Sequence, residues 1–339
     1  MTDAAETLRS EAADLGFTRT RFCDLREAPG IERYDAMLAD GLHADMGWME
    51  GGRDKRADPR SMLPTARSAV VLGLDYGWPR PADPGGLTGK VACYAWGRDY
   101  HNLIGKRLTR LRKRLTRQGI DSTWGVDSRP FIERAWAERS GLGFAGRNCC
   151  TIVPGEGSYL FLAVGLVDVA LPPDPPRGGL ERHCGRCRRC LDACPTDAFL
   201  ASGRIDASRC ISWMTIENRG PIPDPYRAAV GRWVFGCDDC QEVCPHNHAP
   251  PTPLHDDLKP RPGHAWLDLE WVLSTDDAAI DQALNGSPLR RAKPWGLKRN
   301  AALVLGNLAD PAGRPALLRA LEHPHPVVSE QARWSLDRL

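Results

Sequence analysis

The chain has 339 residues, 42% of them hydrophobic and 26% charged, which is typical of a soluble globular protein and excludes a largely disordered chain. Lys and Arg number 45 and Asp and Glu 43, so the net charge of +2 neither requires nor excludes a polyanionic partner. No apolar run approaches the ~20 residues of a membrane helix, and the acidic start of the chain lacks the order of a signal peptide, so we expect a cytoplasmic protein without membrane contact.

The first 170 residues predict helices alternating with strands. Residues 4–15 have the apolar spacing of a helix, and 17–23 indicate a strand. A helix over 33–49, a buried strand over 69–75 and a long basic helix over 99–118 follow. A strand over 123–126, a helix from Pro130 to about Ser140 and two strands after Thr151 complete the series. This order favours an α/β domain over 1–170.

Proline and glycine divide the rest of the chain. Segment 171–179 is a Pro/Gly-rich linker, and a cysteine-rich domain is expected over 178–250. Residues 265–339 contain three runs with i, i+3, i+4 apolar spacing, separated by breaks that contain proline. These runs predict a HEAT-like helical repeat, with a plain helical bundle as the alternative. The expected fold class is therefore a multidomain protein that combines α/β, α+β and C-terminal α-helical parts.

Eight of the twelve cysteines form the strongest chemical signal in the chain. The run Cys184-x2-Cys187-x2-Cys190-x3-Cys194-Pro195 has the spacing of a bacterial ferredoxin. A second run, Cys237-x2-Cys240-x3-Cys244-Pro245, repeats its last three positions, with Cys210 upstream. Eight thiolates are the number that two 4Fe–4S clusters require. A pair of zinc sites is the alternative, although the Cys-Pro that closes each run favours clusters.

The spacing also predicts which cysteines share a cluster. A short loop wraps three thiolates around one face of a cluster, and the fourth ligand comes from the other run. One predicted set contains Cys184, Cys187, Cys190 and Cys244. The other contains Cys194, Cys210, Cys237 and Cys240. Together they would form a dicluster ferredoxin-like domain that relays electrons.

The four remaining cysteines carry weaker signals. Cys23, Cys149 and Cys150 are interpreted as small core residues, which is the usual setting of free cysteine. Cys93 precedes the polar, aromatic segment Tyr94-Ala-Trp-Gly-Arg-Asp-Tyr-His, so a functional thiol and a core residue both remain open for it.

Several segments together resemble a known family. They are Lys55-Arg-Ala-Asp-Pro-Arg, Tyr94-Ala-Trp-Gly-Arg-Asp-Tyr-His, Val126-Asp-Ser-Arg-Pro-Phe-Ile-Glu-Arg, Gly141-Leu-Gly-Phe-Ala-Gly-Arg-Asn and Cys210-Ile-Ser-Trp-Met-Thr-Ile-Glu. With a dicluster block before a helical tail, the chain is similar to the epoxyqueuosine reductases over nearly its whole length. The resemblance implies a fold related to reductive dehalogenases and a base-off cobalamin bound by the first domain. It also implies reduction of epoxyqueuosine to queuosine at the wobble position of a tRNA anticodon.

The resemblance implies a role for Asp127 as proton donor. Removing an epoxide oxygen as water takes two electrons and two protons, so the reaction needs an acid. A carboxyl against an apolar corrin face would have a raised pKa through desolvation and would hold its proton near pH 7. The alternative is an N-cap of the helix that Pro130 opens.

Cofactor contacts are inferred from segments that match those lining the family's cofactor. For each of them an ordinary structural hydrogen bond or a place in the core is the alternative. These candidates are Arg56, Cys93, Asn148, Ser158, Ser212 and Thr215.

The small net charge conceals a basic C-terminal region. Residues 288–339 hold nine Lys and Arg against four acids, a distribution that suits a phosphate backbone. A solvated helix face is the alternative. A wobble base would have to leave the anticodon stack to enter the catalytic pocket. The candidate RNA contacts are Arg290, Arg291, Lys293, Lys298 and Arg299.

Three other functions were weighed against this one. A dehalogenase-like cobalamin enzyme acting on a small molecule would share the cofactors but needs no basic tail. An electron carrier would use the clusters alone, and in a non-catalytic tRNA-binding module the cluster ligands would matter only for folding. No Gly-rich dinucleotide fingerprint is present, so the electrons are expected from an external donor rather than a bound nicotinamide. We expect a monomer.

Overall fold

The computed structural model describes residues 3–26, 28–176, 179–253 and 255–339. Within these residues the largest sheet has four strands in the order β1-β2-β7-β4. The strands are β1 (Arg19–Cys23), β2 (Ser68–Asp75), β7 (Leu160–Val167) and β4 (Ser122–Gly125). Each neighbouring pair is antiparallel.

This pairing corrects the predicted α/β class of residues 1–170. A parallel sheet needs each crossover to return the chain to the same end of the sheet. Here α2 (Ile31–Ala39) and α3 (Arg53–Ala57) connect β1 to a neighbour of opposite direction. The segment is therefore α+β, because apolar periodicity reports helix or strand but not the direction of pairing.

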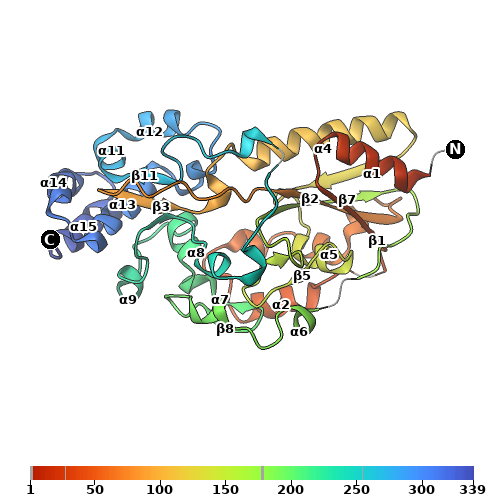
Figure 1. Ribbon diagram of the computed structural model, residues 1–339, viewed down its shortest axis with the longest axis horizontal. Coiled ribbons are helices and arrows are strands. Elements are labelled where there is room, and N and C mark those ends of the chain that lie inside the picture. Colours follow the sequence, from red (N-terminus) through yellow and green to blue (C-terminus); the bar gives the residue numbers. More distant parts are fainter. Residues whose placement is uncertain (1–2, 27, 177–178, 254) are drawn as a thin grey trace.

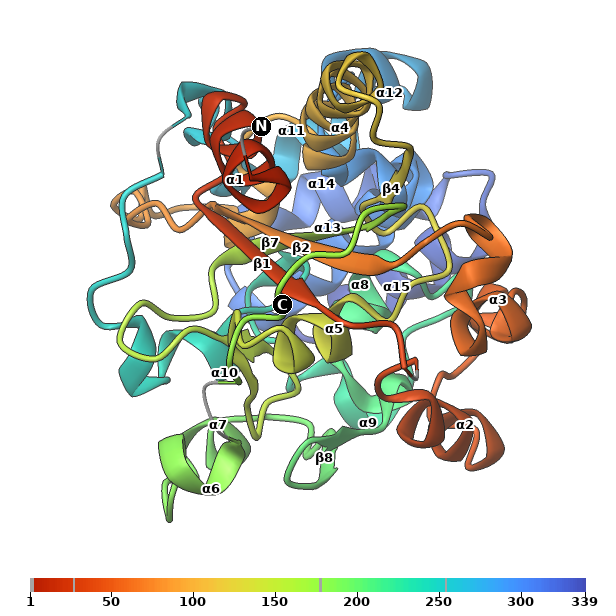
Figure 2. The same ribbon diagram turned by 90° about the vertical axis from the view of Figure 1, so that its right-hand side faces the viewer.

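Helices cover both faces of the sheet (Figures 1 and 2). They are α1 (Ala4–Asp14) and α4 (Tyr100–Arg117) on one face and α5 (Glu133–Arg139) on the other. Successive residues of β2 alternate between the two cores. Val70 and Leu72 pack on the side of α1 and α4, whereas Val71 packs with Trp136 of α5. Burial on both faces explains why β2 is an unbroken apolar run.

Helix α4 confirms the prediction over 99–118 to within a residue at each end. Its apolar side chains recur every three or four residues and are buried, while basic side chains between them face solvent. Asp99 begins the helix by accepting a hydrogen bond from the backbone N–H of His101. The first turn of α4 is therefore fixed, and it contributes to the site described below.

A second sheet joins the three predicted domains. Its order is β10-β3-β11, with β10 (Trp233–Phe235) parallel and β11 (Trp266–Asp268) antiparallel to β3 (Thr88–Val91). One apolar core cluster extends from Ala5 to Ala332. The predicted divisions at 170, 250 and 265 therefore separate stretches of sequence but not separate cores. Residue 178, where the second domain was expected to begin, lies outside the described residues.

The cysteine-rich block consists of short elements beside the strands β5 (Phe144–Ala145) and β6 (Thr151–Ile152). They are α6 (Leu180–His183), α7 (Arg189–Asp192), β8 (Phe199–Ala201), β9 (Arg204–Ile205), α8 (Ile211–Ile216), α9 (Asp224–Arg227) and α10 (Asp239–Glu242). Helices α7 and α10 each belong to one cysteine run, and they pack against each other. The two runs are thus brought together.

The C-terminal part is helical, as predicted. It contains α11 (Leu269–Ser274), α12 (Asp277–Ala283), α13 (Pro294–Leu308), α14 (Arg314–Leu321) and α15 (Pro326–Leu336). Helix α13 packs against α11, α15 and β10, and it is buried from Gly296 to Gly306. The HEAT-like repeat remains a prediction. Among the described residues, no helix combines the length and hydropathy that a membrane crossing needs.

Candidate active site

Asp127 lies in the loop that leaves β4 and precedes α5. Its backbone has a φ of 48°, in the left-handed region that residues other than glycine rarely adopt. The side chain is half exposed, so the apolar burial assumed in the prediction is not present. Helix α5 begins at Glu133 with Ile132 in the N-cap position and no side-chain cap, which excludes the N-cap alternative for Asp127.

The first turn of α4 presents two side chains to this carboxyl. The Tyr100 hydroxyl donates a hydrogen bond to Oδ2 of Asp127, and Nε2 of His101 lies 3.9 Å from the same oxygen. Nδ1 of His101 is 3.0 Å from Oδ1 of Asp99, which orients the ring. The positive end of the helix dipole also faces the carboxylate. This segment is among those that resemble the family, but no role was predicted for Tyr100 or His101.

Aromatic packing holds Tyr100 in place. Its ring stacks on Phe161 of β7 at a centroid distance of 4.2 Å and on His101 at 4.1 Å, with Tyr94 edge-on at 6.2 Å. Burial, and then the charge and hydrogen bond of Asp127, raise the pKa of Tyr100. The phenol therefore remains protonated and acts as a donor to the carboxylate.

Glu133 adds a second carboxyl to the site. Its Oε1 is buried and has no hydrogen-bond partner in the described part of the chain. Burial, followed by the negative charge of Asp127, raises the pKa of Glu133 to about 7, while the backbone N–H of Asp127 donates to its carboxylate. The neighbouring Arg134 donates to the carbonyl oxygen of Cys149 at 2.7 Å. The signal that sequence reasoning missed was an acid placed six residues after Asp127 at the start of a buried helix.

The helical tail reaches the same site through the 3-10 helix η7 (Pro288–Ala292). The guanidinium of Arg291 makes two hydrogen bonds to Glu217, at 2.8 and 2.9 Å. This hydrogen bonding raises the pKa of Arg291, and Tyr100 and Tyr94 lie close enough to contribute. The structure therefore brings a predicted RNA contact next to the residues that surround Asp127.

The five predicted RNA contacts divide by exposure. Arg290, Arg291 and Lys293 are exposed, although Arg290 is paired with Asp281 at 2.5 Å. The predictions for Lys298 and Arg299 are wrong, because both residues lie in the buried part of α13.

Lys298 and Arg299 are bound within the protein and do not offer their charges to RNA. The Lys298 ammonium lies 2.8 Å from Asp277, and its side chain is 7% exposed. Arg299 is 1% exposed, and its guanidinium donates to carbonyl oxygens of residues 214, 218 and 220 at 2.6, 2.9 and 2.5 Å. Burial lowers the pKa of Arg299 to about 9.

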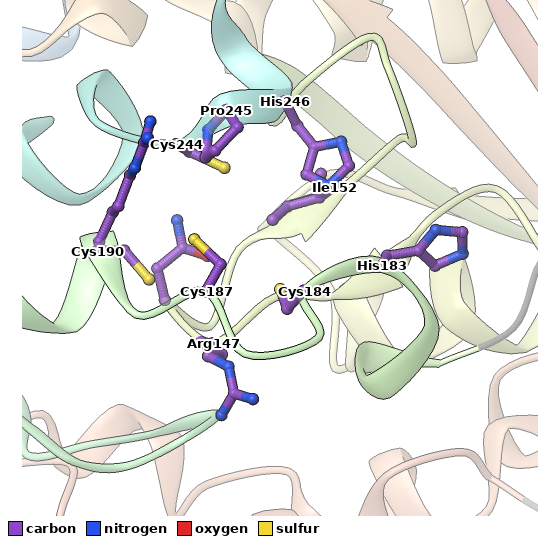
Figure 3. A pocket seen from close by; sticks show the side chains of 11 residues that line it. Arg147, Ile152, His183, Cys184, Cys187, Cys190, Cys244, Pro245 and His246 are labelled. Atoms are coloured by element: carbon purple, nitrogen blue, oxygen red, sulfur yellow. The ribbon is translucent and has the colours of Figure 1, made fainter.

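Four cysteines line one cavity of about 70 Å³ (Figure 3). They are Cys184, Cys187, Cys190 and Cys244, hereafter the first cysteine group. Burial raises the pKa of Cys190 to about 11, and the other three thiols contribute to that rise, so all four lie close together. Spacing alone had predicted this crossed set. Arg147, His183 and His246 complete the wall of the cavity.

The other four cysteines also gather. They are Cys194, Cys210, Cys237 and Cys240, hereafter the second cysteine group. Burial raises the pKa of Cys210, and Cys194 adds to it; Cys237 in turn is affected by Cys210. The pKa of Cys240 is raised most by a hydrogen bond with Cys150, and burial and the nearby thiols raise it further. In the described ranges, no three His, Cys, Asp or Glu side chains converge as they would on a single metal ion.

Three predicted cofactor contacts are buried with partners of their own. Cys93 is 6% exposed, and its thiol points to backbone carbonyl oxygens. The Ser158 hydroxyl donates to Gln241 at 2.8 Å, and the Thr215 hydroxyl donates to the carbonyl oxygen of Ile211 at 2.8 Å. Side chains that are buried and paired in this way do not face a large cofactor, so these predictions are corrected.

The remaining three lie in different surroundings. Asn148 lines the first cysteine cavity, is likewise buried (4% exposed) and donates to the carbonyl oxygen of Cys240 at 3.3 Å, so this prediction is corrected as well. Ser212 hydrogen-bonds to the Cys210 thiol. The Arg56 guanidinium lies over the Tyr34 ring and donates to a neighbouring turn carbonyl at 2.6 Å. Of the six side chains, Ser212 and Arg56 are therefore the two that are not buried.

Two family models match the chain. Residues 183–247 match the 4Fe–4S double cluster binding domain, and residues 56–132 match the epoxyqueuosine reductase QueG domain, DUF1730. The first range holds both cysteine groups, and the second holds Tyr100, His101 and Asp127.

Proteins similar to this one over most of their length share a single description. An epoxyqueuosine reductase of Synechococcus sp. (strain CC9605) is 42% identical over 89% of this chain and 94% of its own. One of Xanthomonas campestris is 37% identical over 99% of this chain and 96% of its own.

Solved structures agree. An epoxyqueuosine reductase bound to an epoxyqueuosine-modified tRNA-Tyr stem loop has a TM-score of 0.90 and 31% identity, covering 98% of this chain and 89% of that one. A Bacillus subtilis epoxyqueuosine reductase with its catalytic aspartate loop swung out of the active site has a TM-score of 0.89 and 29% identity, with the same coverage. The chain belongs to the epoxyqueuosine reductase family.

Proposed function

We propose that this enzyme reduces epoxyqueuosine to queuosine at the wobble position of a tRNA anticodon. The observation that carries the proposal is the meeting of an acid and a nucleic-acid contact in one place. Asp127, hydrogen-bonded by Tyr100, lies close to Arg291 of the basic tail. A structurally similar relative holds an epoxyqueuosine-modified tRNA stem loop, which supports this substrate.

The chemistry assigns distinct tasks to the residues of the site. Two electrons and two protons convert the epoxide to an alkene and water. Asp127 donates a proton to the departing oxygen, which a half-exposed carboxyl in a loop is free to approach. The Tyr100 hydroxyl orients that carboxyl, and His101, held by Asp99, is placed to supply the second proton. Arg290, Arg291 and Lys293 bind the phosphate backbone of the anticodon arm.

The electrons are proposed to pass through two 4Fe–4S clusters. The first cysteine group binds one cluster and the second cysteine group the other. The thiols of each group affect one another's pKa, and four thiolates are the ligand set of one cluster. Ser212 donates its hydrogen bond to a cysteine of the second group, which stabilises the more negative, reduced state of that centre.

Cobalamin, in its base-off form, remains the proposed carrier between the clusters and the epoxide, on the strength of the family resemblance. When bound, it supplies a low-valent cobalt for the reduction of carbon. Four of the six predicted contacts are buried and paired within the protein, so Arg56 and Ser212 are the ones kept as proposed contacts. Cobalt and corrin content after anaerobic reconstitution test this part separately.

The principal experiment is Asp127→Asn in enzyme reconstituted anaerobically, with an epoxyqueuosine-containing tRNA stem loop as substrate. Queuosine formation, followed by mass spectrometry, is expected to fall by about 10²- to 10⁴-fold, the contribution typical of a general acid. Iron content should stay at about eight atoms per chain. Asp54→Asn is the matched control, since the Asp54 side chain is fully exposed on α3. Wild-type turnover by Asp127→Asn would remove the catalytic assignment.

A further inference from the structure

The first cysteine cavity opens at the molecular surface. All eight candidate cluster ligands lie in the described part of the chain, and Cys187 is the one that is exposed. None of the second cysteine group is exposed in this way, and burial helps to raise the pKa of Cys210, Cys237 and Cys240. Because electron transfer requires close approach, the entry point for electrons is the surface around Cys187, if the cysteines bind clusters as proposed above.

Arg147 and Arg189 line this cavity, and Arg186 and Arg188 flank the exposed Cys187 in the sequence. Segment 182–190 contains four arginines and no acid, and all four side chains are exposed. Arg188 pairs with Asp192 at 3.5 Å, but the side chains of Arg186 and Arg189 make no ion pair or hydrogen bond with other described residues. Arg147, across the opening, is fixed by hydrogen bonds to the carbonyl oxygen of Gly185 at 2.6 Å and to Ser202 at 2.9 Å. The rim is therefore positively charged and partly free to pair with another molecule.

An apolar side chain lies beside the arginines. Leu200 of β8 is 46% exposed, one of few large hydrophobic side chains in the described residues with that exposure. It lines a hollow of about 330 Å³ with Arg188, Leu191 and two acids, Asp192 and Asp197, and Arg147 belongs to both this hollow and the cysteine cavity. A small apolar contact inside a charged rim is the composition of a transient protein interface, and weak redox encounters are at the small end of interface sizes.

We propose that this arginine-rimmed surface docks an acidic one-electron carrier protein. The surface consists of Arg147, Arg186, Arg188, Arg189, Leu200 and the opening at Cys187. Each docking transfers one electron from the reduced carrier to the centre held by the first cysteine group, with no proton transferred. Two dockings supply the two electrons of one turnover. This inference rests on the proposed function and extends it by naming the class of electron donor.

A nucleic acid is the other polyanion that such a rim attracts, but the observations favour a protein. A phosphate backbone needs no apolar contact, whereas Leu200 is part of the rim. The exposed cations of η7 lie beside the Asp127 site and already provide for the RNA. Arg147 and Arg189 line the cysteine cavity rather than the Asp127 site.

The test uses the reconstituted holoenzyme without RNA and reduced flavodoxin, a small acidic flavoprotein, as the probe. Binding is measured by calorimetry at low and high salt, and cluster reduction by the loss of visible absorption in a stopped-flow instrument. Arg186→Glu combined with Arg189→Glu is expected to weaken flavodoxin binding and slow its electron transfer by about tenfold or more. Wild-type binding should itself weaken as salt rises.

Controls separate docking from damage to the clusters. Reduction by methyl viologen, a small molecule that needs no docking surface, should be unchanged, as should iron content. Arg314→Glu combined with Arg333→Glu makes the same charge change at exposed positions of α14 and α15 and should leave flavodoxin binding intact. Leu200→Ser, which alters no charge, should weaken flavodoxin binding several-fold.

Two results would overturn the proposal. One is wild-type binding and reduction by flavodoxin in the Arg186/Arg189 variant. The other is a loss of tRNA stem-loop affinity in that variant with flavodoxin binding intact, which would assign the surface to RNA. Failure of the wild-type enzyme to convert epoxyqueuosine with methyl viologen would instead refute the proposed function, and the docking measurements would be unaffected.

Discussion

Glu133 places a buried carboxyl against the backbone of the loop that presents Asp127. Its ionised form accepts a hydrogen bond from the N–H of Asp127, while its Oε1 has no partner within the described residues. The loop also carries the cost of a left-handed backbone at Asp127. The solved Bacillus subtilis relative has a catalytic aspartate loop swung out of its active site. The protonation state of Glu133 is therefore expected to affect how firmly the loop is held.

The first prediction concerns stability and pH. The pKa of Glu133 is raised from 4.5 to about 7, so the folded protein binds this proton more tightly than the unfolded chain. Stability is therefore lost as pH rises from about 4.5 to about 7, by about 3 kcal/mol at most. Glu133→Gln imitates the protonated acid and removes this contribution. Urea unfolding at pH 5 and pH 8 should show wild type losing stability relative to Glu133→Gln; parallel behaviour would contradict it.

The second prediction concerns the hydroxyl of Tyr100. Tyr100→Phe retains the stacking on Phe161 but removes the hydrogen bond to Asp127. Because the hydroxyl orients the acid rather than the substrate, kcat should fall by about tenfold with KM for the stem loop unchanged. Steady-state kinetics with methyl viologen as reductant measure both constants. An equal rise in KM would indicate that Tyr100 contacts the RNA instead.

At the scale of elements, η7 and α13 illustrate where sequence reasoning succeeds and fails. Both cysteine groups follow from spacing, since a short loop can deliver its thiols in only a few ways. A basic residue's charge does not reveal whether it is buried. Arg291 and Arg299 are both arginines of the predicted RNA contacts, yet Arg299 is surrounded by carbonyl oxygens from α8 and the loop after it. The antiparallel sheet was likewise hidden, because periodicity is the same for either pairing direction.

The third prediction separates these two kinds of cation. Lys293→Ala should weaken binding of the tRNA stem loop and reduce its salt dependence by about one phosphate contact. Arg299→Met should lower the free energy of unfolding by about 3 kcal/mol or more, because buried carbonyl oxygens lose their donor. Fluorescence anisotropy at several salt concentrations and urea unfolding make the two measurements. Stable, folded Arg299→Met with weakened RNA binding would restore the original prediction.

At the scale of the whole molecule, the three predicted domains share one framework. Strand β3 lies between β10 and β11, which come from the cysteine-rich block and from the start of the predicted C-terminal domain. Ile211 and Met214 of α8 pack with Ala92 and Leu303, one from each side of the block. Composition predicts where linkers lie, but only tertiary packing shows that the segments do not form separate cores.

The fourth prediction follows from this shared core. The fragment 178–250 made alone should fail to fold and should not retain two clusters, because β10 loses its partner strand and α8 loses its apolar neighbours. Circular dichroism and iron content of the fragment, compared with the full chain reconstituted in parallel, test it. A fragment with native helix content and about eight iron atoms would contradict it.

Two neighbouring side chains of α13 join the tail to the segment between Cys210 and Cys237. Arg299 donates to carbonyl oxygens of the stretch that follows Cys210, and Asn300 donates to those of Thr215 and Val234 at 2.8 and 2.9 Å. Under the proposed function, the RNA contacts of the tail and the second cysteine group are therefore held together by hydrogen bonds within the protein. Their relative position is set when the chain folds, so it is already fixed before a tRNA binds.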